Sequence, residues 1–168
     1  MRKRRILRFK AIAVFLAALT GFAGCTDTCT ENKNAVPLAG FYAAGGTQRV
    51  DVDSLEVVGV GAPGDSVLSS ASVTKNELYL PLRIDSDTTR YVFRNTAGAG
   101  NTRDTVTFVY SRTPRFVNVE CGASYIFDIR DITSQGLLID SVTCPNGFID
   151  NTNAENLRIY FAVSPEEP

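Results

Sequence analysis

Apolar and polar residues alternate one by one along several stretches of this chain, and this alternation restricts the fold more than any other feature. In "ELYLPLRI" (77–84) every second residue is leucine or isoleucine, and "DTVTFVYS" (104–111) and "NLRIYFAV" (156–163) repeat the pattern. Successive side chains of a strand point to opposite faces, so a period of two predicts strands with one buried face. Pro81 has no N–H to donate, which predicts a sheet edge or a bulge in its strand.

Shorter segments with strand character fill most of the chain after residue 37, at 38–43, 54–60, 89–95, 115–121, 124–132 and 136–144. Sequences typical of turns, rich in Gly, Pro and Asn, separate them. No stretch after residue 25 has apolar residues at the spacing of a helix. We therefore predict an all-β domain, an antiparallel β-sandwich of the Greek-key, immunoglobulin-like type, with a small β-barrel as the alternative.

The first 24 residues have the composition of a secretion signal. Six Lys and Arg residues and no acid precede an apolar run at 11–24. A helix that spans a bilayer needs roughly 20 apolar residues, so this shorter run predicts a signal peptide. The run ends in "FAGC", which resembles the lipobox of bacterial lipoproteins except that Phe22 replaces the usual leucine. The resemblance implies that Cys25 is lipidated and becomes the first residue of the mature chain.

Cleavage before Cys25 gives a signal peptide (1–24), a lipidated N-terminus with a polar tether (25–36) and a single β-sandwich domain (37–168). The chain has 17 Lys and Arg residues against 18 Asp and Glu residues, and losing six cations leaves a mature net charge of −7. An acidic chain lacks the cationic surface that binds phosphates, so we expect no nucleic-acid partner. We expect a cell-envelope protein, lipid-anchored to the outer membrane on its periplasmic face or at the cell surface. Its partner would be an unknown envelope protein or glycan.

The residue types exclude most enzyme mechanisms. The chain contains no histidine, so it has no Ser-His-Asp triad, no Cys-His pair and no histidine metal ligand. Glu120, Asp128 and Asp131 could supply a carboxylate pair, as in glycosidases, but their spacing favours solvated surface charge. The Asp-x-Asp pairs at 51–53 and 85–87 do not continue as calcium-binding loops. We expect no enzyme activity, no metal and no cofactor.

One tripeptide pattern is more frequent than composition predicts. Asp, then Ser or Thr, then an aliphatic residue or Thr occurs five times, against about 0.7 expected. The pattern resembles the O-glycosylation motif of Bacteroidota-type envelope proteins, in which the hydroxyl receives the glycan. That resemblance implies five candidate acceptors: Ser54, Ser66, Thr88, Thr105 and Ser141. The alternative is structural, because Asp-Ser and Asp-Thr also bond the local backbone where a turn enters a strand.

The cysteines other than Cys25 lie in an oxidising compartment if the chain is exported. Cys29, Cys121 and Cys144 allow three pairings, each of which leaves one thiol over. We favour Cys29 with Cys121, because Cys29 lies in a polar tether without a packing role and Cys121 ends a strand. Cys144 ends the alternating segment "LLIDSVTC" and is interpreted as a small buried hydrophobe. Three free thiols without histidine do not predict a zinc site.

Five stretches carry a resemblance to a known family: "CTDTCTE", "VDSLEVVGVGAPGDSV", "LYLPLRIDSDTTRYVF", "DTVTFVYSRTPRFVNVECG" and "NTNAENLRIYF". Over residues 25–163 the chain resembles small Bacteroidota-type envelope lipoproteins classed only as a domain of unknown function. The resemblance implies an envelope location and a bridge between the cysteines of "DTC" and "ECG", with Cys144 outside the family pattern. It implies no reaction.

Three functions remain open on this reading. The favoured one is a lipid-anchored, non-catalytic binding or accessory module. The second is a structural surface lipoprotein whose glycans are the function, and the third is a carboxylate-based glycosidase. The absence of tryptophan weakens the case for sugar stacking, although tyrosines could still offer a binding face. Those tyrosines are Tyr42, Tyr79, Tyr91, Tyr125 and Tyr160.

Overall fold

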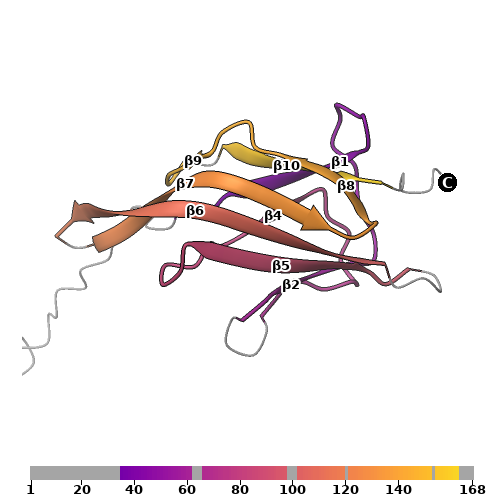
Figure 1. Cartoon of the computed structure of the whole chain (residues 1–168), viewed down its shortest axis with the longest axis horizontal. Coiled ribbons are helices and arrows are strands. Elements are labelled where there is room, and N and C mark those ends of the chain that lie inside the picture. Colours follow the sequence, from indigo (N-terminus) through magenta and orange to yellow (C-terminus); the bar gives the residue numbers. More distant parts are fainter. Residues whose placement is uncertain (1–34, 62–65, 98–101, 120, 153, 163–168) are drawn as a thin grey trace, which may run out of the picture. The chain divides into compact units, whose positions relative to one another are not determined.

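The computed structural model describes residues 35–61, 66–97, 102–119, 121–152 and 154–162. All of them belong to one compact unit, Glu31–Pro168. No helix with the length and apolar character of a membrane span occurs in these ranges. The described strands (Figure 1) are β1 (Leu38–Ala43), β2 (Leu55–Gly59), β3 (Val67–Ser69), β4 (Glu77–Tyr79), β5 (Thr88–Asn95), β6 (Arg103–Asn118), β7 (Gly122–Gln135), β8 (Ile139–Thr143), β9 (Phe148–Ile149) and β10 (Glu155–Phe161).

The described strands lie in two sheets that pack together (Figure 1). This arrangement confirms the predicted β-sandwich rather than the alternative, a small β-barrel. The four-stranded sheet has the order β4-β1-β10-β8, and the six-stranded sheet has the order β3-β2-β5-β6-β7-β9. Neighbouring strands pair antiparallel. The exception is the pair of β1 with β10, which runs parallel. The first and last described strands therefore lie side by side in the middle of one sheet.

The segment 77–84 forms a shorter strand than the alternation predicts. β4 pairs with β1 only along Glu77–Tyr79, and it is an edge strand, as Pro81 indicated. Leu80 stays in the core without a ladder, and its N–H donates to the Pro37 carbonyl at 3.0 Å. Ile84 is exposed, contrary to the alternation, because the chain has left the sheet before it.

Other strands also differ from the prediction. The segments 104–111 and 115–121 are mostly one continuous strand, β6, rather than two. β3 and β9 were not predicted, because three and two residues are too short to show a period.

The core lies between the inner faces of the two sheets. Phe41 and Ile159 from the four-stranded sheet are fully buried, as are Phe93 and Phe108 from the six-stranded sheet. The ring of Phe41 meets that of Phe161 edge-on at 5.4 Å, an arrangement that aromatic pairs favour. Phe108, Ile159 and Phe161 are apolar residues of the alternating segments, so the alternation predicted this part of the core correctly.

One carboxylate is buried beside this core. Asp104, near the start of β6, is 1% exposed. Its Oδ1 accepts the N–H of Leu138 at 3.0 Å and its Oδ2 accepts the N–H of Ile139 at 2.7 Å. The segment between β7 and β8 approaches Asp104 closely at Gly136, whose φ is +144° and where a Cβ would lie 1.7 Å from Asp104 Oδ1. Asp104 thus fixes the connection that crosses from one sheet to the other.

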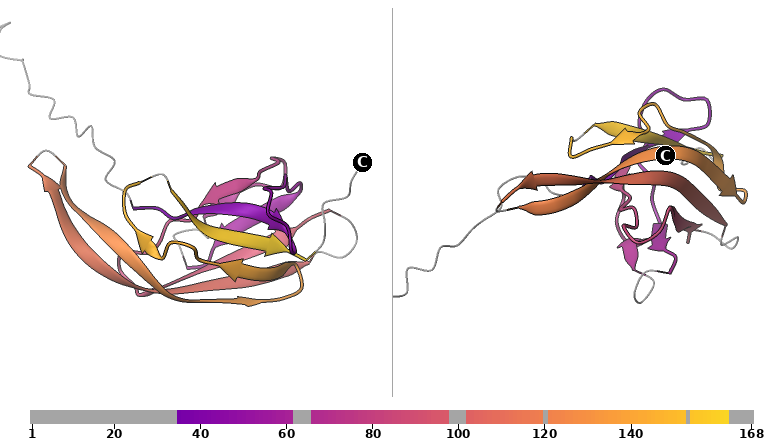
Figure 2. Two further views of the ribbon diagram at one scale, coloured as in Figure 1. Left: turned by 90° about the horizontal axis from the view of Figure 1, so that it is seen from above. Right: turned by 60° about the vertical axis from the view of Figure 1, so that its left-hand side comes forward.

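The β6–β7 hairpin continues beyond the sheets. β5 accompanies β6 only as far as Val109, and β9 pairs with β7 only at Phe127 and Asp128. Figure 2 shows the far part of the hairpin extending past the other strands. We call residues 112–119 and 121–127 the arm. Among its described residues only Cys121 and Phe127 are buried.

Candidate functional site

The outer face of the four-stranded sheet gathers polar and aromatic side chains. Along β1, β4 and β10 these side chains alternate with the residues that enter the core, so strand geometry directs them outward. An arginine from the segment after β1 joins them. We call this set the tyrosine face: Gly40, Tyr42, Arg49, Glu77, Tyr79, Glu155, Arg158 and Tyr160.

Glu155 is the centre of a hydrogen-bond network on the tyrosine face. Its Oε2 accepts from Arg49 Nη2 at 2.8 Å, from Arg49 Nε at 3.0 Å and from the Tyr42 hydroxyl at 2.7 Å. Its Oε1 accepts from Arg158 Nε at 2.7 Å. Arg49 also donates to Glu77 through Nη1. One guanidinium therefore joins β4 to β10 across β1.

The network holds Glu155 in its ionised form. Partial burial acts to raise its pKa, but hydrogen bonds from Arg158, Tyr42 and Arg49 outweigh that effect, and the pKa is lowered. The pKa of Arg49 is raised, chiefly by its hydrogen bond to Glu155. A carboxyl group that acts as a general acid needs the opposite shift. Glu155 therefore provides a fixed negative charge and hydrogen-bond acceptor on this face.

Gly40, in β1, leaves room for the Glu155 carboxylate and the Arg49 side chain to approach the strand closely. A Cβ on this residue would lie 2.4 Å from Glu155 Oε2 and 3.0 Å from Arg49 Nε. Any side chain here would displace the carboxylate, so the close approach depends on glycine. An isolated glycine inside the predicted strand 38–43 was the one sequence signal that could have indicated this site. The network itself was missed, because Arg49 and Glu155 are 106 positions apart.

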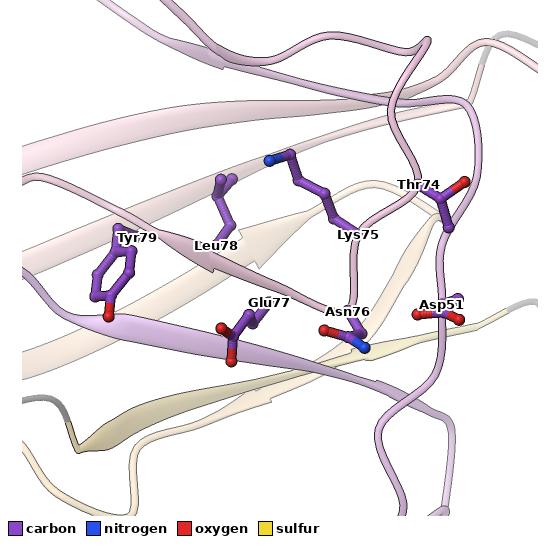
Figure 3. Close-up of a pocket in the computed structure, with 7 residues that line it drawn as sticks. All are labelled: Asp51, Thr74, Lys75, Asn76, Glu77, Leu78 and Tyr79. Atoms are coloured by element: carbon purple, nitrogen blue, oxygen red, sulfur yellow. The ribbon is translucent and has the colours of Figure 1, made fainter.

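A pocket of about 360 Å³ adjoins the tyrosine face, to which it is connected by Glu77 and Tyr79. Figure 3 shows these two side chains on one side of β4 and Leu78 on the other. Tyr79 is 44% exposed. The pocket is lined mainly by polar groups: Asp51, Thr74, Lys75, Asn76, Glu77, Leu78 and Tyr79. Its size falls within the range of small-molecule sites.

A second pocket, of about 420 Å³, lies along the 121–127 side of the arm. Ala35 and Ala123 both line it, so the start of the described chain lies close to β7. Its lining is mostly apolar: Ala35, Val36, Pro81, Leu82, Ile84, Ala123, Ser124, Tyr125 and Phe127. Of the tyrosines named as a binding face, Tyr125 lines this pocket, whereas Tyr91 is buried and its hydroxyl donates to the Pro81 carbonyl.

The predicted lipidation and disulfide residues lie partly outside the described residues. Cys25 and Cys29 are not among them, so the lipid site and the Cys29–Cys121 bridge stay predictions. Cys121 is buried and is not free, and its N–H donates to Asn118 Oδ1 at 2.6 Å. Cys144 is the free cysteine of the described part of the chain. It is half-buried against the core, and burial raises the pKa of its thiol.

The glycosylation candidates are all at least partly exposed. Ser66 is exposed, and Ser54, Thr88, Thr105 and Ser141 are half-exposed. Four of the aspartates that precede them have partners in the fold. Asp53 accepts from Thr74, Asp87 pairs with Arg112 at 2.9 Å, Asp104 binds two N–H groups, and Asp140 accepts from Ser141 at 3.0 Å. Both the structural and the glycosylation interpretation therefore stand.

The carboxylates named for catalysis or metal binding do not form a cluster in the described residues. Asp128 pairs with Arg130 at 3.0 Å, and Glu120 lies outside the described ranges. Asp85 is bound by Arg83, and its hydrogen bond from that guanidinium lowers the pKa of Asp85 to about 2. No group of three potential ligands suited to a metal occurs among the residues that the structure describes.

Comparisons with known proteins place the chain without assigning an activity. No curated protein and no solved structure matches it. The sequence profile of the family of unknown function DUF6452 matches residues 54–161, which span β2 to β10. The matched region includes Glu77, Tyr79 and Glu155 but not Arg49 or Tyr42. Because the match covers well over half of the 168 residues, the chain belongs to the family of unknown function DUF6452.

Proposed function

We propose that the chain is a lipid-anchored cell-envelope protein whose β-sandwich is a non-catalytic binding module for an envelope glycan. The observation that carries the binding role is the tyrosine face, where Arg49, Glu77 and Glu155 are fixed by mutual hydrogen bonds next to the exposed ring of Tyr79. Groups that are ordered before binding lose little conformational entropy when a ligand arrives. Such a surface suits a polar, hydroxyl-rich ligand.

The chemistry of the pocket favours a glycan over an apolar ligand. Asp51, Asn76 and Glu77 offer oxygen and amide groups along its wall, and Lys75 adds a donor. The Tyr79 ring offers a flat apolar surface on which a sugar ring can stack. The lowered pKa of Glu155 and the pairing of Glu77 with Arg49 support binding rather than glycoside hydrolysis.

Glycan-array screening, followed by titration of the best glycan, tests this role. Tyr79→Ala should raise the Kd by about tenfold, which corresponds to a loss of about 1.4 kcal/mol of binding free energy. Phe148→Ala is the matched control, because Phe148 is also an exposed aromatic residue but lies on β9 of the other sheet. No binding to any glycan, or an equal loss in both variants, would reject the glycan. A captured protein whose binding needs Tyr79 would assign the face to a protein partner instead.

The anchor is supported by the cationic and apolar segment that ends at Cys25. Labelling with radioactive palmitate in the native host should mark the wild-type chain and not Cys25→Ser. Membrane flotation should then separate the two forms. A wild-type chain that takes up no label would refute the anchor.

A structural glycosylated surface lipoprotein is the second candidate. The partial or full exposure of all five candidate hydroxyls supports it. Intact-mass measurement of protein from the native host would decide, since a mass explained by polypeptide plus lipid leaves no room for glycans.

A further inference from the structure

We propose that the tip of the arm, residues 115–119, rests on the lipid surface of the membrane that holds the chain. This inference rests on the proposed lipid anchor at Cys25 and adds a second contact with the same membrane. The contact would fix the orientation of the domain, which a single attachment point cannot do by itself.

The tip carries apolar side chains that the described residues leave in solvent. Phe116 is 68% exposed and Val119 is 87% exposed. Exposed apolar residues are ordinary when scattered, but these two lie three positions apart at the end of a projecting hairpin. The β6–β7 pairing continues to Asn118 and Gly122, so the tip is held by a paired ribbon.

The charge beside these residues suits an interface with lipid headgroups. Arg115 is exposed and precedes Phe116 directly. An arginine next to an aromatic residue places a cation among the headgroups while the ring enters the boundary with the acyl chains. The mature chain as a whole carries a net charge of −7 and Glu120 follows Val119 directly, so the contact would depend on the apolar side chains and on Arg115 and not on overall charge.

The arm lies beside the start of the described chain, so a membrane that holds Cys25 is within its reach. Ala35 lines the same pocket as Ala123, which pairs with Phe116, so the chain enters the domain beside the arm. Ten residue steps join Cys25 to Ala35, which extend to at most about 36 Å. The arm spans about 20 Å from Arg112 to Asn118, since a strand rises about 3.3 Å per residue. A lipid on Cys25 would therefore keep the arm within reach of the bilayer, and a Cys29–Cys121 bridge would shorten the distance further.

A single-tryptophan experiment tests the contact in the lipidated full chain, which lacks tryptophan. Phe116→Trp is reconstituted into vesicles of phosphatidylethanolamine and phosphatidylglycerol with brominated acyl chains. Leu137→Trp is the control, because Leu137 is 83% exposed and follows the opposite end of β7. Brominated lipid should quench the tryptophan at 116 at least about twofold more than the one at 137, since interfacial side chains enter the outermost acyl region.

Flotation of each reconstituted sample separates the two proposals. Protein that floats with equal quenching at both positions would overturn the arm contact and leave the anchor standing. Protein that does not float would refute the anchor, and with it the arm contact. A blue-shifted emission at 116 that depends on protein concentration, without lipid quenching, would show that a second copy covers the tip, which also overturns the proposal.

Discussion

The buried carboxylate of Asp104 gives the sharpest test of how this fold is held together. Asp104→Ala removes the acceptor of the Leu138 and Ile139 N–H groups while the surrounding backbone stays buried. A hydrogen bond to a charged group contributes about 1.5 to 3 kcal/mol. The cost of burying the carboxylate offsets part of the sum of the two hydrogen bonds. We expect the free energy of unfolding to fall by about 3 to 4 kcal/mol, a large part of the total for a domain of this size.

Urea denaturation followed by far-ultraviolet circular dichroism measures this change at neutral pH. Asp140→Ala is the matched control, because Asp140 precedes a serine and a valine, much as Asp104 precedes a threonine and a valine, but is exposed. It should change the free energy of unfolding by less than about 0.5 kcal/mol. Asp104→Asn keeps one carbonyl oxygen and should fall between the two. A loss below about 1 kcal/mol in Asp104→Ala would refute the claim that these two bonds hold the β7–β8 connection.

Four further predictions follow from the described residues. Gly40→Ala should weaken glycan binding through the displaced Glu155 carboxylate, and titration calorimetry measures the loss. The pKa of Glu155 lies below its ordinary value of 4.5, so its contribution to stability is present above that pH and is lost as the pH falls through the lowered pKa. The difference in urea midpoint between the wild-type chain and Glu155→Gln should therefore be smaller at pH 3 than at neutral pH. The raised thiol pKa of Cys144 should make its reaction with Ellman's reagent slow at pH 8 until urea unfolds the chain. If glycans are present, peptide mapping should find higher occupancy at Ser66 than at Thr105, which pairs with strands on both sides.

The alternation of residues was enough to predict the fold class and most of the core. It succeeded for 104–111 because both neighbours of that part of β6 are strands and one face is covered by the other sheet. Where that cover ends, it predicted a second strand and not the continuation of the first. Residues 112–118 continue the same strand through Pro114, because no β5 residue accompanies this part of β6 and an uncovered edge tolerates a missing N–H.

Local sequence patterns could not predict the candidate site, for a different reason. Arg49 lies outside the predicted strands, and nothing near it in the sequence indicates Glu155 as a partner. Their contact depends on the parallel pairing of β1 with β10, which brings the two ends of the described chain together. That pairing is set by which apolar faces bury each other, and an alternating segment carries no label for its neighbour.

The five Asp-Ser and Asp-Thr tripeptides show the same limit within a single motif. Asp104 and Asp140 stand in equivalent tripeptides, yet one carboxylate is buried and binds two backbone N–H groups while the other is exposed. The excess of the pattern over composition therefore has at least one structural source. Ser66 differs from the other candidates, because it is exposed and lies just before the short edge strand β3. A modification enzyme that acts on the folded chain would find Ser66 the most accessible of the five candidates. The tripeptide therefore identifies the candidate residues, and their exposure in the fold determines their order of accessibility.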